Sequence, residues 1–167
     1  MYNIKNYYLN ISYDGTKYCG WQIQKKDSTI QGEIQNVLTD IFKNQSINLI
    51  GSGRTDSGVH AKEQSANICL DTSMNPYQIK SALNRKLPED IHINDCRVIN
   101  KDFNARFSAK KREYNYYIIN HYSTSERLYS WYCKWEIDNK KLFQCSDILI
   151  GENDFSLFSK ASAETKN

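Results

Sequence analysis

Residues 7–13 read Tyr7-Tyr8-Leu9-Asn10-Ile11-Ser12-Tyr13 and are followed by Asp14-Gly15. Tyrosine, leucine and isoleucine alternate with smaller or polar residues, which is the period of a β-strand with one buried face. Asp-Gly is a common turn dipeptide, so the strand is expected to end before it. The segment therefore predicts a first strand over residues 7–13.

Two later segments have the spacing of amphipathic helices. Large apolar residues recur at helical intervals over residues 30–42, and Ser28 with Gln31 fits a capping box at the start of that helix. A second helix is predicted to begin behind Asn75 as the N-cap, with a proline at its first position, and to end at Pro88.

Three further strands are predicted around these helices, at residues 46–50, 65–70 and 91–99. The resulting order is strand, helix, strand, strand, helix, strand, which is that of the ferredoxin-like βαββαβ unit. We assign this unit to a first subdomain, residues 1–103.

The rest of the chain starts in a similar way. Alternating tyrosines and isoleucines predict a long strand over residues 109–119, and an aromatic-rich strand is predicted over residues 128–137. A helix through Leu142 and Leu149 would then be closed by Gly151. The expected fold is thus α+β: a ferredoxin-like unit followed by part of a second, similar unit with an antiparallel sheet, in residues 104–167.

The composition is that of a globular protein. Hydrophobic residues make up 40% of the 167 residues and charged residues 25%. No apolar run approaches the roughly 18 residues of a membrane-spanning helix, and the first residues lack the apolar region of a signal peptide, so the protein is expected to be soluble and unexported. The net charge of +3 is too small to indicate nucleic-acid binding by itself. Five scattered cysteines with no C-x-x-C pair favour free thiols, each expected to be buried or half-buried.

The stretch Gly51-Ser-Gly-Arg-Thr-Asp-Ser-Gly-Val-His-Ala61 carries the chemistry. It is not a phosphate-binding loop, because Gly58 is followed by Val-His instead of Lys and a hydroxyl residue. An aspartic-protease site fits poorly, since such sites need two carboxylates sharing a proton and Arg54 would keep Asp56 ionised. The third interpretation is one ionised aspartate, with Arg54 as its charge partner, acting as a nucleophile or stabilising a cationic sugar-like transition state. A surface turn with no function is the remaining alternative.

Residues 53–61 closely resemble the active-site signature of the TruA-type tRNA pseudouridine synthases. Other segments match the same family in the same order: Tyr13-Asp14-Gly15-Thr16, Gly20-Trp21-Gln22, Gln31-Gly32-Glu33, Asn104-Ala105-Arg106-Phe107-Ser108-Ala109 and Gly151-Glu152-Asn153-Asp154-Phe155. The resemblance extends from Tyr13 to about Phe158.

The resemblance implies isomerisation of uridine to pseudouridine in the tRNA anticodon stem-loop, at positions thirty-eight to forty, with neither metal nor cofactor. Asp56 would be the catalytic residue, Arg54 its salt-bridge partner, and Tyr114 the ring that stacks on the target uracil. The residues expected to bind tRNA form a basic cluster with interleaved aromatic rings: Arg106, Phe107, Lys110, Lys111 and Arg112. The full-length protein would be a cytoplasmic homodimer with no membrane partner.

A non-catalytic RNA-binding module of the same ferredoxin-like shape is the main competing function. It fits less well, because the RNP1 pattern of such modules is absent from the predicted strands and the Gly-rich loop would have no purpose. The C-terminal half that closes the cleft in the family matches no segment of this chain. The 167 residues are therefore expected to be an incomplete synthase, inactive or nearly so when alone.

Overall fold

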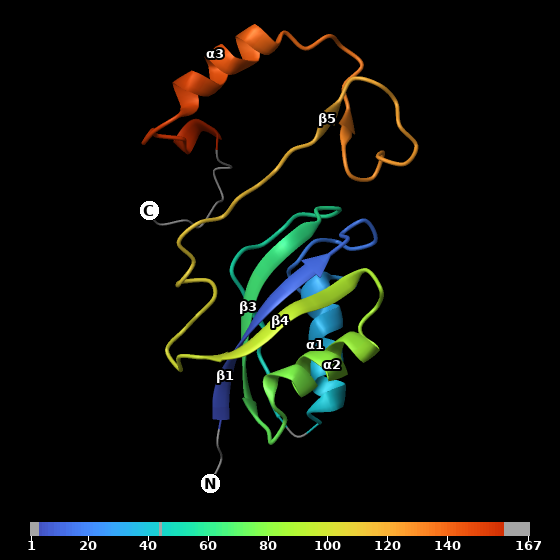
Figure 1. Ribbon diagram of the computed structural model, residues 1–167, viewed down its shortest axis with the longest axis vertical. Coiled ribbons are helices and arrows are strands. Elements are labelled where there is room, and N and C mark those ends of the chain that lie inside the picture. The colour runs from blue at the N-terminus through green and yellow to red at the C-terminus, as the bar shows by residue number, and fades with distance from the viewer. Residues whose placement is uncertain (1–3, 44, 159–167) are drawn as a thin grey trace. The chain divides into compact units, whose positions relative to one another are not determined.

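A computed structural model describes residues 4–43 and 45–158 (Figure 1). The chain forms two compact units, Met1–Asn115 and Tyr116–Asn167. The subdomain boundary expected after residue 103 stays a prediction, and residues 159–167 of the expected second subdomain lie outside the described residues.

The first unit has the predicted order of strands and helices. Its elements are β1 (Ile4–Tyr13), α1 (Ile30–Ile41), β2 (Ile50–Gly51), β3 (Ala61–Asp71), α2 (Pro76–Lys86) and β4 (Ile91–Ile99). The sheet order is β2-β3-β1-β4, and every neighbouring pair is antiparallel. Both helices lie on the same face of this sheet (Figure 1). The ferredoxin-like prediction is confirmed.

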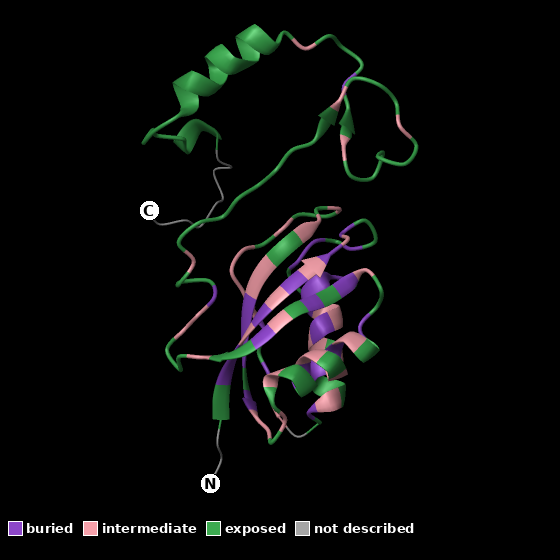
Figure 2. Cartoon of the chain, in the orientation of Figure 1, coloured by how far each residue is buried: buried purple, intermediate pink, exposed green. Residues whose placement is uncertain are grey.

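The core lies between the sheet and the two helices. Tyr7, Leu9 and Ile11 point into it from β1, as the alternation predicts, and each is 1% exposed or less. Isoleucines and leucines at helical spacing cover them from α1 and α2: Ile30, Ile34, Leu38, Ile79 and Leu83. Buried positions, purple in Figure 2, recur along the strands of the sheet and along α1.

Asn75 is the N-cap of α2, as predicted, and it forms a capping box with Gln78 that was not predicted. The cap of α1 differs from the prediction by one residue. Thr29 is the N-cap and accepts a hydrogen bond from the Gly32 amide, whereas the Ser28 hydroxyl donates to the Glu33 carboxylate. Both residues are good caps, and Ile30, at the first helical position, is fully buried.

The strand predicted over residues 46–50 is wrong in extent, since β2 contains only Ile50 and Gly51. Ile47 and Leu49 are buried as a strand pattern requires, but their backbone groups bond to a helix side chain instead of to another strand. Gln35 of α1 donates to the Ile47 carbonyl at 2.6 Å and accepts from the Leu49 amide at 3.2 Å. These two backbone groups therefore have hydrogen-bond partners without a neighbouring strand.

The second unit contains β5 (Ile118–Ile119), β6 (Trp131–Tyr132), the helix α3 (Asn139–Leu149) and a 3-10 turn at Ser156–Phe158. The strands predicted over 109–119 and 128–137 are wrong in extent, because only β5 and β6 form there, with two residues each. The two strands pair in parallel. A strand needs a neighbour for its backbone groups, and most of these residues lie exposed along an irregular chain. The predicted helix is confirmed, but none of its residues is buried (Figure 2).

The five cysteines are free, as predicted. Only Cys96 and Cys133 are buried, so the expectation of burial fails for the other three. Burial raises the pKa of the Cys96 thiol to about 12, which keeps it protonated and unreactive. In the part of the chain that the structure describes, no helix is long and apolar enough to cross a membrane.

Candidate active site

The Gly-rich loop connects β2 to β3, and its first residues are held by β3. The Ser52 amide donates to the Ser65 carbonyl at 2.8 Å. Gln64 bridges the next two residues, because its amide nitrogen donates to the Gly53 carbonyl at 2.6 Å and its oxygen accepts from the Ser52 hydroxyl at 3.0 Å. The base of the loop is therefore fixed to a central part of the sheet.

Thr55, in the middle of the loop, is held by the end of β1 and the segment after it. Its hydroxyl shares a 2.9 Å hydrogen bond with the Tyr13 hydroxyl, and its carbonyl accepts from the Trp21 amide at 3.0 Å. Burial raises the pKa of Tyr13, so this phenol stays neutral near neutral pH. Both Tyr13 and Trp21 belong to the buried core, and the loop thus rests directly on it.

Gly20 allows this close approach. Its φ of +85° lies in the left-handed region, and a Cβ at this position would be 2.5 Å from the Thr55 carbonyl oxygen. No other residue type could occupy this position without moving the loop.

A tight turn follows at residues 56–59. The Val59 amide donates to the Asp56 carbonyl at 3.2 Å, and Gly58 has a φ of +78°, as the third residue of a type II turn requires. The Ser57 hydroxyl and the Gly58 amide both donate to the Tyr18 carbonyl. The loop backbone is consequently held on both sides of Asp56.

Asp56 itself is exposed, and its side chain projects from this fixed backbone. Arg54 is exposed as well, and within the described residues the two form no ion pair, so the predicted salt bridge is not present. Thr55 turns inward to Tyr13 and Trp21, and the charged side chains on either side of it remain in solvent.

Tyr114 reaches this loop although it follows Asp56 by 58 residues in the sequence. Its hydroxyl lies 3.9 Å from the place that a Cβ on Gly53 would take, and the residue is 66% exposed. The structure thus brings together the loop of Asp56, Tyr114 and Arg112, whose guanidinium donates to the Ser52 carbonyl.

The remaining residues of the predicted basic cluster are exposed. The Arg106 guanidinium lies 5.7 Å from the centre of the Phe107 ring, which is 80% exposed. Lys111 forms a 2.8 Å ion pair with Glu113, which raises the pKa of Lys111 and lowers that of Glu113. Part of its positive charge is therefore offset locally, whereas Lys110 is exposed beside it.

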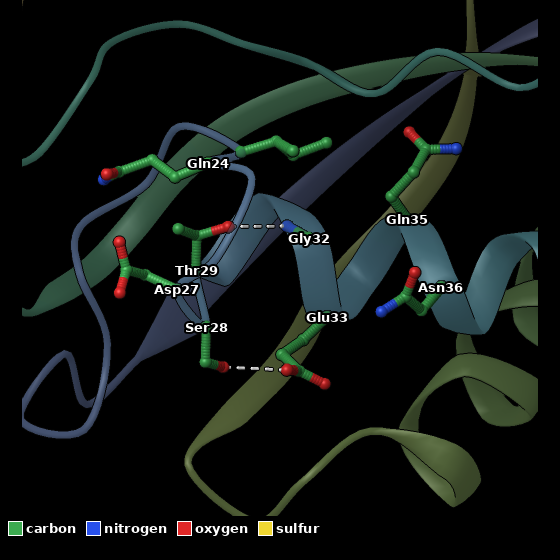
Figure 3. A pocket seen from close by; sticks show the side chains of 9 residues that line it. Gln24, Asp27, Ser28, Thr29, Gly32, Glu33, Gln35 and Asn36 are labelled. Atoms are coloured by element: carbon green, nitrogen blue, oxygen red, sulfur yellow. Dashed lines mark hydrogen bonds between the residues drawn. The ribbon is translucent and has the colours of Figure 1, made fainter.

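A surface hollow at the start of α1 lies apart from these residues (Figure 3). Polar side chains line it, and two of its hydrogen bonds, from Ser28 to Glu33 and from the Gly32 amide to Thr29, serve the helix cap. None of the predicted site residues lines it. The described residues also contain no group of three or more side chains placed to hold a metal ion.

Sequence reasoning missed the residues that fix the loop, namely Gln64, Tyr18 and the hydroxyl of Tyr13. A glutamine inside a strand carries no local signal for such a role. Tyr13 and Gly20 lie in segments that resemble the family, but their contacts with Thr55 depend on the tertiary fold.

We expect Gly20→Ala to destabilise the chain by about 2–4 kcal/mol, because the new Cβ would meet the Thr55 carbonyl and occupy a disfavoured φ. Urea unfolding at low protein concentration, followed by circular dichroism, measures this change. Gly58→Ala is the matched control: its φ is also positive, but no atom lies within 4 Å of the new Cβ, so the strain of about 1 kcal/mol acts alone. Equal losses for the two variants would contradict the packing argument.

The fold and this loop define an α+β enzyme of the pseudouridine synthase class: residues 10–108 match the family model described as tRNA pseudouridine synthase. A protein of Caldicellulosiruptor saccharolyticus named tRNA pseudouridine synthase A is 40% identical over 166 residues, which cover 98% of this chain and 68% of that protein. Proteins of the same name from Bacillus sp. (strain KSM-64) and Francisella tularensis subsp. novicida are each 38% identical, with 68% and 63% of their lengths covered and 98% and 97% of this chain. The chain belongs to the tRNA pseudouridine synthase family, whose members are isomerases.

Proposed function

We propose that the protein isomerises uridine to pseudouridine in the anticodon stem-loop of tRNA, at positions thirty-eight to forty, with Asp56 as the catalytic nucleophile. The observation that carries this proposal is the placement of Asp56. Its carboxylate is exposed on a loop whose backbone is held by Tyr13, Tyr18, Trp21 and Gln64. A carboxylate that is free to react, on a backbone that is fixed, is suited to a reaction in which substrate and catalytic group must be held in one orientation.

The reaction breaks the N1–C1′ bond of uridine, turns the base and forms a C5–C1′ bond, while the proton on C5 is lost and N1 gains one. The product has the same atoms as the substrate, so no co-reactant is needed. A carboxylate can first attack C1′ or the ring, or stabilise positive charge that develops on the sugar. Asp56 would act in this step, and the buried, neutral Tyr13 would hold the loop through Thr55 without exchanging its proton.

Tyr114 would receive the target base. A uridine inside a stem must leave the stack before it can react, and an exposed aromatic ring recovers part of the stacking energy. Tyr114 is 66% exposed and its hydroxyl lies beside Gly53, three residues before Asp56. A base stacked on the ring would then meet the carboxylate of the same loop. Arg54, exposed and unpaired with Asp56, would contact the substrate close by.

The RNA backbone would pass along Arg106, Phe107, Lys110 and Lys111. Exposed cations beside an exposed ring suit a strand of RNA with its phosphates and an unstacked base. We further propose that the full-length protein acts as a cytoplasmic homodimer and that residues 1–103 and 104–167 are its functional subdomains.

We expect replacement of Lys110 and Lys111 by alanine to weaken binding of all tRNAs alike. Loss of two phosphate contacts lowers the slope of log Kd against log salt concentration by about 1 to 2. Lys110 should contribute more, because Glu113 already offsets the charge of Lys111. Titrations of fluorescent tRNAs at several salt concentrations measure the effect. A loss of affinity confined to some tRNAs would show that the lysines read bases.

The proposed function is tested by turnover. The assay protein is residues 1–167 fused to the remaining part of the C. saccharolyticus relative, called the extended chain below. Unmodified tRNA transcripts are incubated with it, and pseudouridine is mapped by carbodiimide labelling and reverse transcription. Pseudouridine at positions thirty-eight to forty, and none when these uridines are replaced by cytidine, is the expected result. Binding of tRNA without any conversion would favour the non-catalytic RNA-binding module.

A further inference from the structure

Arg112 belongs to the predicted tRNA-binding cluster, but its guanidinium is turned toward the protein. Its Nε and Nη2 atoms donate to the Ser52 carbonyl oxygen at 3.0 and 2.5 Å, and Nη2 also lies 3.3 Å from the Arg106 carbonyl. Two donors on one oxygen use the fork geometry that distinguishes arginine from lysine. The acceptor is a backbone atom at the base of the Asp56 loop.

Gly53 provides the space for this contact. A Cβ on Gly53 would lie 3.3 Å from Nε and 3.4 Å from Cδ of Arg112, so the arginine side chain lies closely over the glycine. The Tyr114 hydroxyl is the next atom, at 3.9 Å. Arg112 and Tyr114 therefore cover the same residue of the loop from the same segment of chain.

This segment has no regular secondary structure between β4 and β5 and is tied to the sheet at its other end by buried asparagines. The Ala105 amide donates to Asn67 at 2.8 Å, Asn67 donates to Asn6 at 3.0 Å, and Asn6 donates to the Phe103 carbonyl at 2.8 Å. Among the described residues that follow Ala105 up to residue 115, the hydrogen bonds to the loop come from Arg112. Tyr114 lies two residues beyond this second attachment.

We propose that Arg112 is a positioning residue: it fastens the segment of Tyr114 to the base of the Asp56 loop and so sets the spacing between the stacking ring and the carboxylate. The proposal rests on the proposed function of the site and changes the part that Arg112 plays in it. The guanidinium is engaged by carbonyl oxygens and acts through Tyr114 and Gly53, whereas the phosphate contacts belong to the neighbouring cations. A lysine at this position could not reproduce the two-donor contact.

The kinetic test compares Arg112→Met and Arg112→Lys in the extended chain. We expect both to lower the single-turnover rate on the order of 100-fold, because small displacements of reacting groups cost this much. The Kd for tRNA and its salt dependence should stay within about threefold of the unmodified protein, since no phosphate contact is lost. Arg85→Met is the control, because Arg85 is an exposed arginine on α2. It should change neither quantity. Melting temperatures show whether each variant folds, and Arg112→Gln replaces any variant that does not.

A second measurement does not depend on turnover. Trypsin should cut after Lys110 and Lys111 about tenfold faster in both variants than in the unmodified 167-residue chain, because local release exposes the segment to the protease. Cleavage after Lys140, in the first turn of α3, is the internal reference. If the extended chain made no pseudouridine, the proposed function would fail, and the cleavage rates would still decide whether Arg112 fastens the segment.

Two results would overturn the proposal. Unchanged cleavage after Lys110 and Lys111 would show that Arg112 does not hold the segment. A normal single-turnover rate, combined with weaker tRNA binding and a salt slope lower by about 1, would make Arg112 a phosphate contact.

Discussion

Asp56→Asn in the extended chain should lower the single-turnover rate of pseudouridine formation by at least about 10⁴-fold. Asparagine has nearly the size of aspartate, but its amide is neither a nucleophile nor a negative charge. The fold should be unchanged, because the loop is held through backbone atoms and neighbouring side chains and the exposed Asp56 carboxylate contributes no hydrogen bond within the described residues. The affinity for tRNA should stay within about threefold, since catalysis and phosphate binding use different groups.

Rapid mixing with excess protein over labelled tRNA gives the rate, and a titration gives the Kd. Asp27→Asn is the matched control, because Asp27 is also an exposed aspartate in a loop and lines only the hollow at the start of α1. It should behave as the unmodified protein does. Conversion by Asp56→Asn within tenfold of the unmodified rate would rule out the carboxylate as the catalytic group.

The first unit could be predicted in detail because its local patterns and its tertiary packing agree. Tyr7, Leu9 and Ile11 alternate in sequence, and the same residues are buried in β1. Asn75 and Pro76 start α2 because a cap and a proline at the first position serve the same backbone geometry. The cap of α1 was predicted one residue early, at Ser28 instead of Thr29, because the exact start of a helix depends on tertiary packing that cannot be read from one short segment.

The strands predicted after Ala109 show what an alternating pattern alone cannot predict. The alternating aromatic residues after Ala109 have the period of a strand, but a strand forms only where a neighbour pairs with its backbone. In the described part of this segment, pairing is confined to Ile118 and Ile119 with Trp131 and Tyr132. Periodicity predicts which face a segment would bury and says nothing about whether a partner is present.

The candidate site, too, could be predicted only in part from the sequence. The residue types of the loop, with one aspartate, one arginine and three glycines, indicate its chemistry from sequence alone. The attachments of the loop do not follow from sequence, because Gln64 and Arg112 come from separate parts of the chain and bind backbone carbonyls, which every residue has. The anchoring of Thr55 between Arg54 and Asp56 likewise depends on the tertiary fold, since its partner Tyr13 lies at the end of β1.

The apolar surface of the second unit predicts how the 167-residue chain behaves alone. Phe143, Ile148 and Leu157 are between 69% and 96% exposed. The helix α3 has no buried residue, although Leu142, Cys145 and Leu149 recur along one side of it. Apolar surface of this extent, exposed in water, promotes association. The chain alone should therefore aggregate at micromolar concentrations, whereas the extended chain should remain monodisperse in light scattering.

The activity of the 167-residue chain should also be lower than that of the extended chain. Asp56 and Tyr114 are exposed in this chain, and water weakens the electrostatic stabilisation that a closed site supplies. The relatives named tRNA pseudouridine synthase A are longer, since this chain covers 68% of the C. saccharolyticus protein.

We expect the 167-residue chain to form pseudouridine at least about 10³-fold more slowly than the extended chain, the loss that follows when a site lacks its preorganised surroundings. The two proteins are compared with the same tRNA at concentrations where light scattering shows both to be dispersed. The extended chain with Asp56→Asn is the control. Any activity that it retains comes from the added part and not from the Asp56 loop. Equal rates for the two proteins would show that residues 1–167 already form a complete site.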